Sequence, residues 1–173
     1  ITVTTALLRA GRLAPEAAAA IAAEHEAAGW PLPAELLAEI CLAHEQPEEA
    51  LLHAERAISQ EADGGNRYKW VAAQEIKLRA LLRLRRTEEV LPLADDALHV
   101  AEEHGYRPLE WRAHATKAAA LVALGDTAGA QPHYDMAAAV IRMLGETIED
   151  PALKQTYLEL SLIHISEPTR QAE

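Results

Sequence analysis

Residues 111–145 read WRAHATKAAALVALGD and then TAGAQPHYDMAAAVIRMLG. The first part spaces apolar or long side chains at the i, i+3 and i+4 interval of one buried helix face. These residues are Ala113, Lys117 (through its methylene stem), Ala120, Leu121 and Leu124. Gly125 suits the end of this helix, and Asp126 or Thr127 suits the cap of a second helix that ends at Gly145 in the left-handed conformation. The stretch therefore predicts a hairpin of two antiparallel helices.

Much of the chain repeats this hairpin at a period of forty residues. The segments PEEALLHAERAI (47–58), TEEVLPLADDAL (87–98) and TAGAQPHYDMAA (127–138) superpose without gaps. Residues of the same kind recur at this spacing, as in Gly65, Gly105 and Gly145, Pro92 and Pro132, and Ala57, Ala97 and Ala137. A fixed period of this size is typical of stacked helical hairpins.

Turn and cap signals predict the remaining helices. We expect helices at 4–12, 15–28, 34–44, 47–62, 67–86 and from 151 to about 160, with Thr87 and Asp150 as caps. Pro92 and Pro132 lie about five residues inside their helices, so either the regular helix starts late or its first turn is 3₁₀-like. Because both repeats share the proline, we interpret it as a feature of the repeat and not as a break.

The predicted fold is all-α. Val, Ile and Thr are sparse and never alternate over a strand-length run. We expect about eight or nine antiparallel helices in right-handed superhelical stacking, a tetratricopeptide-like α-solenoid, with turns at Gly29, 64–65, Gly105 and Gly125. Alanine-rich helices bury little area each, so no single hairpin is expected to be stable alone.

The amino-acid composition limits which classes of binding partner and which cellular location we expect. The formal net charge of −11 disfavours nucleic acid as a partner. No apolar run has the roughly 18 residues of a membrane span, and no signal peptide is visible. We therefore expect no membrane contact and a cytoplasmic location. The single Cys41 excludes an internal disulfide and falls at a core position of the repeat, which favours a buried, inert thiol.

Catalytic and metal-binding signals are weak. No HExxH motif occurs, His99 and His104 are five residues apart, and His133 is followed directly by Tyr134 and Asp135, so their side chains diverge. Before residue 161 there is one serine, Ser59, and no nucleophile elbow. We predict no enzyme activity, no cofactor and no metal site.

A basic cluster in the middle of the chain has two interpretations. It consists of Lys77, Arg79, Arg83, Arg85 and Arg86. These residues can form a phosphate or nucleic-acid site, or they can pair with the acidic helices on either side of them in sequence. The second interpretation is the stronger one, with roughly 0–1 kcal/mol per solvated pair.

The last residues resemble a sequence that is not a protein family. Residues 161–170, SLIHISEPTR, resemble the in-frame translation of a transposase-type sequencing adapter, and residues 171–173 read as the start of its index. The resemblance implies that residues 161–173 are a non-native tail. Together with the absence of an initial Met, it implies that residues 1–160 are a repeat domain truncated at both ends.

The hairpins resemble tetratricopeptide-like repeats. The small positions match at Ala50, Val90 and Ala130 and again at Ala57, Ala97 and Ala137, whereas the expected aromatic is present only as Tyr134. Gly125 supplies the turn glycine in the last repeat, and Glu45 and Arg85 replace it in the others. The order of these repeats and the end segment at 137–160 resemble the C-terminal arrays of two classes of bacterial protein. These are the ATP-dependent regulators of the maltose-activator type and the adenylate/guanylate cyclases.

This resemblance implies a protein–protein interaction or sensing module of a larger bacterial signalling or transcription-regulatory protein. Its partner is a protein or peptide segment, or another domain of the parent chain. In such arrays the first helix of each hairpin lines a concave groove. The matching residues are Glu35, Glu39, Leu42, Glu75, Arg79, Leu82, Arg112, Ala115, Ala119 and Val122. Arg79 and Arg112 are expected to meet a carboxylate. The alternative is a passive spacer that positions a fused ATPase or cyclase.

Overall fold

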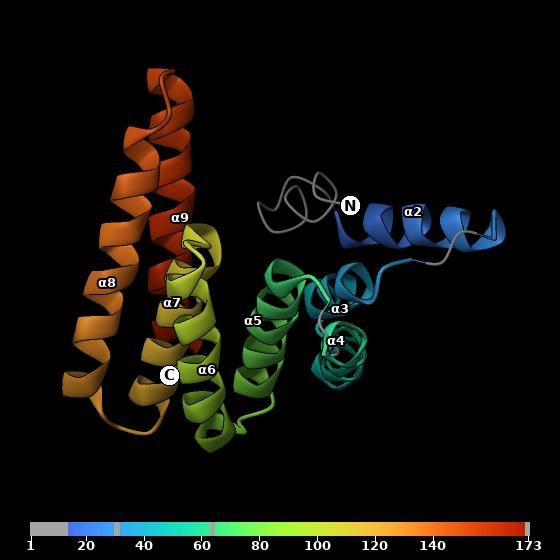
Figure 1. Ribbon diagram of the computed structural model, residues 1–173, viewed down its shortest axis with the longest axis horizontal. Coiled ribbons are helices and arrows are strands. Elements are labelled where there is room, and N and C mark those ends of the chain that lie inside the picture. The colour runs from blue at the N-terminus through green and yellow to red at the C-terminus, as the bar shows by residue number, and fades with distance from the viewer. Residues whose placement is uncertain (1–13, 30–31, 63–64, 172–173) are drawn as a thin grey trace. The chain divides into compact units, whose positions relative to one another are not determined.

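The computed structural model describes residues 14–29, 32–62 and 65–171 (Figure 1). The helices are α2 (Pro15–Ala27), α3 (Ala34–Ala43), α4 (Pro47–Glu61), α5 (Arg67–Arg83), α6 (Thr87–Glu103), α7 (Arg107–Ala123), α8 (Thr127–Glu146) and α9 (Pro151–Gln171). The helix expected at 4–12 lies outside the described residues, as does Gly64 of the predicted turn.

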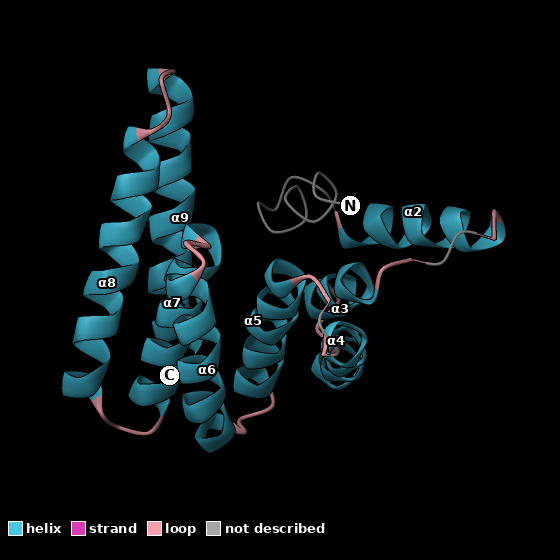
Figure 2. Ribbon diagram, viewed as in Figure 1, coloured by secondary structure: helices cyan, strands magenta, loops and turns pink. Residues whose placement is uncertain are grey.

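The described chain is all-α, as predicted: helices are joined by short loops, and these residues contain no strand (Figure 2). It divides after Leu84 into two compact units. In the first unit α3 packs on α4 and α4 on α5. In the second, α6 packs on α7, α7 on α8, and α8 on α9. Consecutive packing of this kind is consistent with a repeat of helical hairpins, while the right-handed superhelix stays a prediction.

The helix boundaries confirm the period of forty. The second helices begin at Pro47, Thr87 and Thr127, and the helices before them end forty residues apart, at positions 43, 83 and 123. Between them the chain has a positive φ at Glu45 (58°), Arg85 (57°) and Gly125 (86°). The turn conformation is therefore the same in all three repeats, although only one of them has the glycine that this conformation favours.

Small side chains form the helix contacts at the repeat positions. Ala50, Val90 and Ala130 are each at most 1% exposed. The positions two helical turns later are equally buried: Ala57, Ala97 and Ala137. Residues this small let helix axes approach closely but bury little apolar area each, as the composition predicted.

The core of the second unit lies where α7, α8 and α9 meet. Trp111, Ala115, Ala137, Val140 and Ile141 form one buried cluster. The α9 side chains that pack against it are Tyr157, Leu158 and Ile165. The predicted buried face of α7 is confirmed at Ala113 and Ala120, but Leu124 is 45% exposed, because it lies just past the end of α7, at its C-cap.

The interpretation of Gly145 as a left-handed helix end is wrong. It lies inside α8, which continues to Glu146, and the α8 C-cap is Thr147, whose hydroxyl donates to the Leu144 carbonyl at 2.7 Å. A Cβ at position 145 would lie 2.8 Å from Leu158 Cδ2. The glycine thus leaves room for the Leu158 side chain of α9, and tertiary packing explains it better than turn geometry.

The predicted caps are confirmed in part. Asp126 Oδ1 accepts from Gly129 N–H at 2.8 Å, and Asp150 Oδ1 accepts from the backbone of Ala152 at 2.8 Å. Thr87 is not a cap but the first helical residue, and Arg86 in the cap position makes no side-chain cap bond. Side-chain oxygens that accept from the first turn satisfy donors that the helix itself cannot.

The two internal prolines do not break their helices. Pro92 lies inside α6 and Pro132 inside α8, and both are exposed. Both helices are α-helical from their first residues, Thr87 and Thr127, so neither of the two alternatives, a late start or a 3₁₀-like first turn, is found, while the absence of a break is confirmed.

Helix α9 ends later than the sequence predicts. It was expected to stop near Leu160, but it continues to Gln171 through the adapter-like residues. Ser161 is buried, and Ile165 packs against the Trp111 cluster. The start of the adapter-like sequence is therefore not a helix boundary.

Among the described helices, none has both the length and the apolar character that a membrane crossing requires.

The repeated turn predicts opposite effects for two substitutions. Gly125→Ala places a side chain in the left-handed region, where it meets no atom within 4 Å, so only backbone strain is added. We expect a loss of about 1 kcal/mol in the free energy of unfolding. Glu45→Gly removes that strain and should stabilise by up to about 1 kcal/mol. Urea unfolding followed by circular dichroism measures both, and equal signs for the two variants would contradict the shared turn geometry.

Truncation after Leu160 tests the tail. Of the described side chains beyond that residue, Ile165 is the one that packs on the Trp111 cluster. Losing a half-buried Ile contact should lower the free energy of unfolding by about 1 kcal/mol. Thermal unfolding of the chain with and without residues 161–173 provides the measurement. A loss of several kcal/mol would show that the tail is an integral part of the second unit.

Candidate functional site

The most buried charges of the first unit surround Arg79. Its Nε lies 2.7 Å from Glu75 Oε1, one turn back on α5, and its Nη2 bonds to Glu39 on α3. The carboxylates are almost fully enclosed, with side chains 3% exposed for Glu39 and 1% for Glu75, whereas Arg79 is 28% exposed. Burial works against the charged form of Arg79, but Glu39 and Glu75 outweigh it and hold the pKa of the guanidinium above its usual value.

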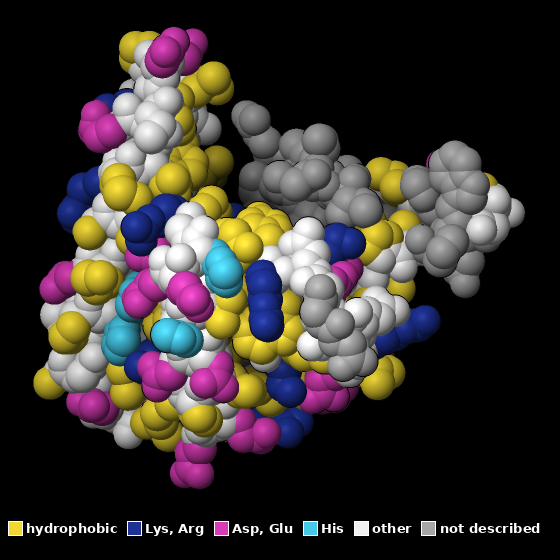
Figure 3. Space-filling view, in the orientation of Figure 1, with side chains coloured by type: hydrophobic (Ala, Val, Ile, Leu, Met, Phe, Trp, Pro, Cys, Tyr) yellow, Lys and Arg dark blue, Asp and Glu magenta, His cyan; other side chains and the backbone are white. Residues whose placement is uncertain are grey.

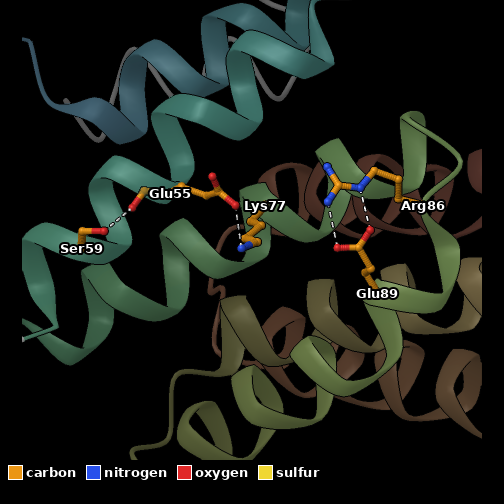
Figure 4. A network of polar contacts seen from close by, with 5 residues as sticks. All are labelled: Glu55, Ser59, Lys77, Arg86 and Glu89. Carbon is orange, nitrogen blue, oxygen red and sulfur yellow. Dashed lines mark hydrogen bonds and ion pairs between the residues drawn. The ribbon is translucent and has the colours of Figure 1, made fainter.

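An ion pair between two consecutive helices occurs at equivalent positions in two repeats. Lys77 Nζ on α5 lies 2.9 Å from Glu55 Oε1 on α4 (Figure 4), and in the second unit Lys117 on α7 pairs with Asp95 on α6. The partners are separated by 22 residues in both cases, and each residue of one pair is forty residues from its counterpart. The acidic partners are more than half exposed, so each pair contributes little stability.

Two further arginines of the basic cluster, Arg83 and Arg86, each bond within the unit to which they belong. Arg83 Nη1 donates to the Leu42 carbonyl at 2.7 Å. Arg86 donates from Nε and Nη2 to both carboxylate oxygens of Glu89, at 2.6 and 2.8 Å (Figure 4). The interpretation of this cluster as pairs with the flanking acidic helices is confirmed for Lys77 and Arg86, which pair with Glu55 and Glu89. Arg79 pairs instead with the enclosed Glu39 and Glu75, and Arg83 donates to a backbone carbonyl.

The residues predicted to line a groove divide by burial. Five lie in the interior: Glu39, Leu42, Glu75, Ala115 and Ala119. Five are partly exposed: Glu35, Arg79, Leu82, Arg112 and Val122. The structure brings Glu39, Glu75 and Arg79 together as one ionic cluster, and it places Ala115 in the packed Trp111 cluster. The guanidinium of Arg112 lies over the Trp111 ring, 5.1 Å from its centroid.

A histidine cluster in the second unit was not predicted. His114 Nδ1 on α7 lies 3.0 Å from His133 Nδ1 on α8. His114 Nε2 on the other side of the ring lies 3.8 Å from Glu102 Oε1 on α6, and Glu110 is one helical turn before His114. The Glu-x-x-x-His spacing of residues 110 and 114 was a usable signal, but Glu102 comes from another helix and no sequence motif joins it to them.

Burial controls the protonation of this cluster. It lowers the pKa of His114, against the opposing effect of Glu110, and it also lowers the pKa of His133, to which the charge of Lys117 adds. Both imidazoles therefore favour the neutral form near neutral pH. A neutral imidazole has a lone pair that can accept a proton or bind a metal ion.

Cys41 shows no sign of reactivity. The side chain is partly buried on α3, and burial raises the pKa of the thiol, with Glu49 adding to the effect. A raised pKa reduces the thiolate fraction, which is the nucleophilic form. The prediction of a buried, inert thiol is therefore corrected in one respect. Cys41 is only partly buried, but its raised pKa indicates low reactivity.

The comparisons with known proteins identify no relative. No family model matches the chain, and neither the curated proteins nor the solved structures contain a significant match.

The Arg79 cluster predicts a structural effect for its removal. Arg79→Ala removes the guanidinium that pairs with the enclosed carboxylates of Glu39 and Glu75, so we expect a loss of about 3 kcal/mol in the free energy of unfolding. The matched control is Lys77→Ala, which removes a more exposed pair and should cost less than about 1 kcal/mol. Chemical denaturation at neutral pH measures the free energy of unfolding of both variants. Similar losses of free energy in the two variants would show that Arg79 does not compensate buried charge.

Proposed function

We propose that this chain is a protein-interaction or sensing module of a larger bacterial signalling or transcription-regulatory protein, located in the cytoplasm. It binds a partner segment along the first helices of its repeats and has no catalytic role of its own. The observation that supports this proposal most directly is the exact recurrence of helix boundaries, turns and interhelical ion pairs at forty residues. Repeat architectures of this kind commonly present extended binding surfaces.

The partly exposed first-helix residues are the candidate contacts. Arg112 is the strongest of them, because the residue is partly exposed and its guanidinium lies over the Trp111 indole ring. An arginine oriented in this way suits a carboxylate ligand, such as an acidic side chain or the carboxyl terminus of a peptide. Arg79 is a weaker candidate than the sequence suggested, because Glu39 and Glu75 already pair with it.

The alternative is a passive spacer, and one observation favours it. Half of the predicted groove residues are buried in the interior, including Glu39 and Ala115. If packing accounts for these positions, then the repeats serve to hold a fused ATPase or cyclase at a fixed position. The two functions differ in whether the first helices bind any ligand.

Peptide binding separates the two functions. A library of short synthetic peptides with free carboxyl termini is screened against the 173-residue chain, and the best binder is measured by fluorescence polarisation. For an interaction module we expect Arg112→Ala to weaken binding by at least about tenfold, the loss of one desolvated charged hydrogen bond. Arg142→Ala, which removes an exposed arginine of α8, is the matched control and should leave binding unchanged.

Two outcomes support the spacer. One is the absence of any peptide binder. The other is equal affinity of the selected peptide for wild type, Arg112→Ala and Arg142→Ala. Thermal unfolding of each variant is measured in parallel, so that a loss of binding at an unchanged melting temperature is assigned to the contact and not to the fold.

A further inference from the structure

Two helices of the second unit bring three metal-binding side chains together. Glu102 lies near the end of α6, and Glu110 and His114 lie one turn apart on α7. One ligand atom from each of the three residues lies within 4.8 Å of the others. Figure 3 shows histidine side chains beside acidic ones over the helices of this unit. We propose that Glu102, Glu110 and His114 form a binding site for a divalent transition-metal ion, with Zn²⁺ as the representative ion.

The strongest support is the unsatisfied nitrogen of His114. Its side chain is only 6% exposed, and its Nε2 has no hydrogen-bond partner among the described residues. The atom faces Glu102 Oε1 at 3.8 Å, too far for a hydrogen bond. A buried polar atom without a partner is costly. A metal ion between the two atoms would satisfy both of them.

The distances suit a small ion. Bonds from Zn²⁺ to histidine nitrogen and carboxylate oxygen are about 2.0–2.2 Å, so one ion can bridge two atoms that are 3.8 Å apart. The Glu102 side chain is 51% exposed and has room to adjust its rotamer. The mixture of one imidazole and two carboxylates favours a transition-metal ion over Ca²⁺ or Mg²⁺, which prefer oxygen ligands alone.

His133 acts behind the site as an orienting partner. When His114 Nδ1–H donates to His133 Nδ1, at 3.0 Å, the Nε2 of His114 carries the lone pair and points to the carboxylates. Metal-bound histidines usually donate their second N–H to a carboxylate, a backbone carbonyl or water, which fixes the ring and its tautomer, and here the nitrogen of His133 takes that role.

The charges around the site favour a dication. Arg107 Nη1 holds Glu110 through Oε2 at 2.6 Å, which fixes this buried carboxylate and leaves its other oxygen for coordination. Two carboxylates and one guanidinium leave one net negative charge beside a neutral histidine. The nearby Lys117 is paired with Asp95 and adds no net charge. A bound dication would therefore join α6 to α7 and change the net charge of the site from −1 to +1.

The test is calorimetric titration of Zn²⁺ into the metal-free 173-residue chain at pH 7.5. We expect one equivalent to bind and the melting temperature to rise when Zn²⁺ is in excess. Glu102→Gln removes one exposed ligand with little change in shape and should weaken binding by at least about tenfold. The matched control is Glu103→Gln, the same change at the next residue, which is exposed and not in the cluster, so its affinity should equal that of wild type.

Imidazole ¹⁵N spectra assign the binding to this site. Zn²⁺ should shift the Nε2 resonance of His114 in the wild type and in Glu103→Gln. The proposal is overturned if the wild type binds no Zn²⁺. It is also overturned if Glu102→Gln binds as tightly as Glu103→Gln, or if the His114 resonances do not move while other histidines do. Because no peptide is involved, each of these results is independent of the proposed interaction function.

Discussion

The close approach of helices at buried alanines is the constraint on which the rest of the structure depends. Ala50, Ala54 and Ala57 on α4 are at most 1% exposed, and Ala94 and Ala97 on α6 have no exposed surface. Each such contact removes little apolar area from water, and at about 25 cal/mol per Å² it contributes little free energy. A single hairpin built this way cannot offset its loss of conformational entropy, so the helices depend on stacking against further helices of the same unit.

Alanine contacts alone do not define how one helix is placed along the next, because they look alike at successive turns. In the first unit the enclosed pairing of Glu39 on α3 with Arg79 on α5 supplies that information, since sliding α5 along α3 would separate the buried Glu39 carboxylate from the Arg79 guanidinium. The exposed Lys77–Glu55 pair repeats the same alignment at the surface with little energy of its own. Apolar packing thus supplies cohesion, and the buried ionic cluster supplies register.

Features with a local cause were predictable from sequence, and features with a tertiary cause were not. The period of forty, the turns and the Asp150 cap follow from residues near one another in the chain. Gly145 carried the local signal of a helix end, yet its position reflects contact with Leu158 on another helix. Ala115 was placed in the groove by the resemblance to tetratricopeptide-like repeats, and that resemblance does not reveal that side chains of α8 and α9 pack around it. For the same reason, the sequence did not predict that Glu102 on α6 lies beside His114 on α7.

The repeat itself explains why the histidine cluster stands apart. The residue forty positions before His114 is Gln74, which is also buried and whose Oε1 also has no hydrogen-bond partner among the described residues. At this position in two successive repeats, one side-chain polar atom therefore has no hydrogen-bond partner among the described residues: Oε1 of Gln74 and Nε2 of His114. The positions that correspond to Glu102 and Glu110 hold Ala62 and Trp70, so only the later repeat surrounds the unsatisfied atom with carboxylates. In an array whose backbone is constant, such departures from the repeat are where chemical specificity can arise without altering the fold.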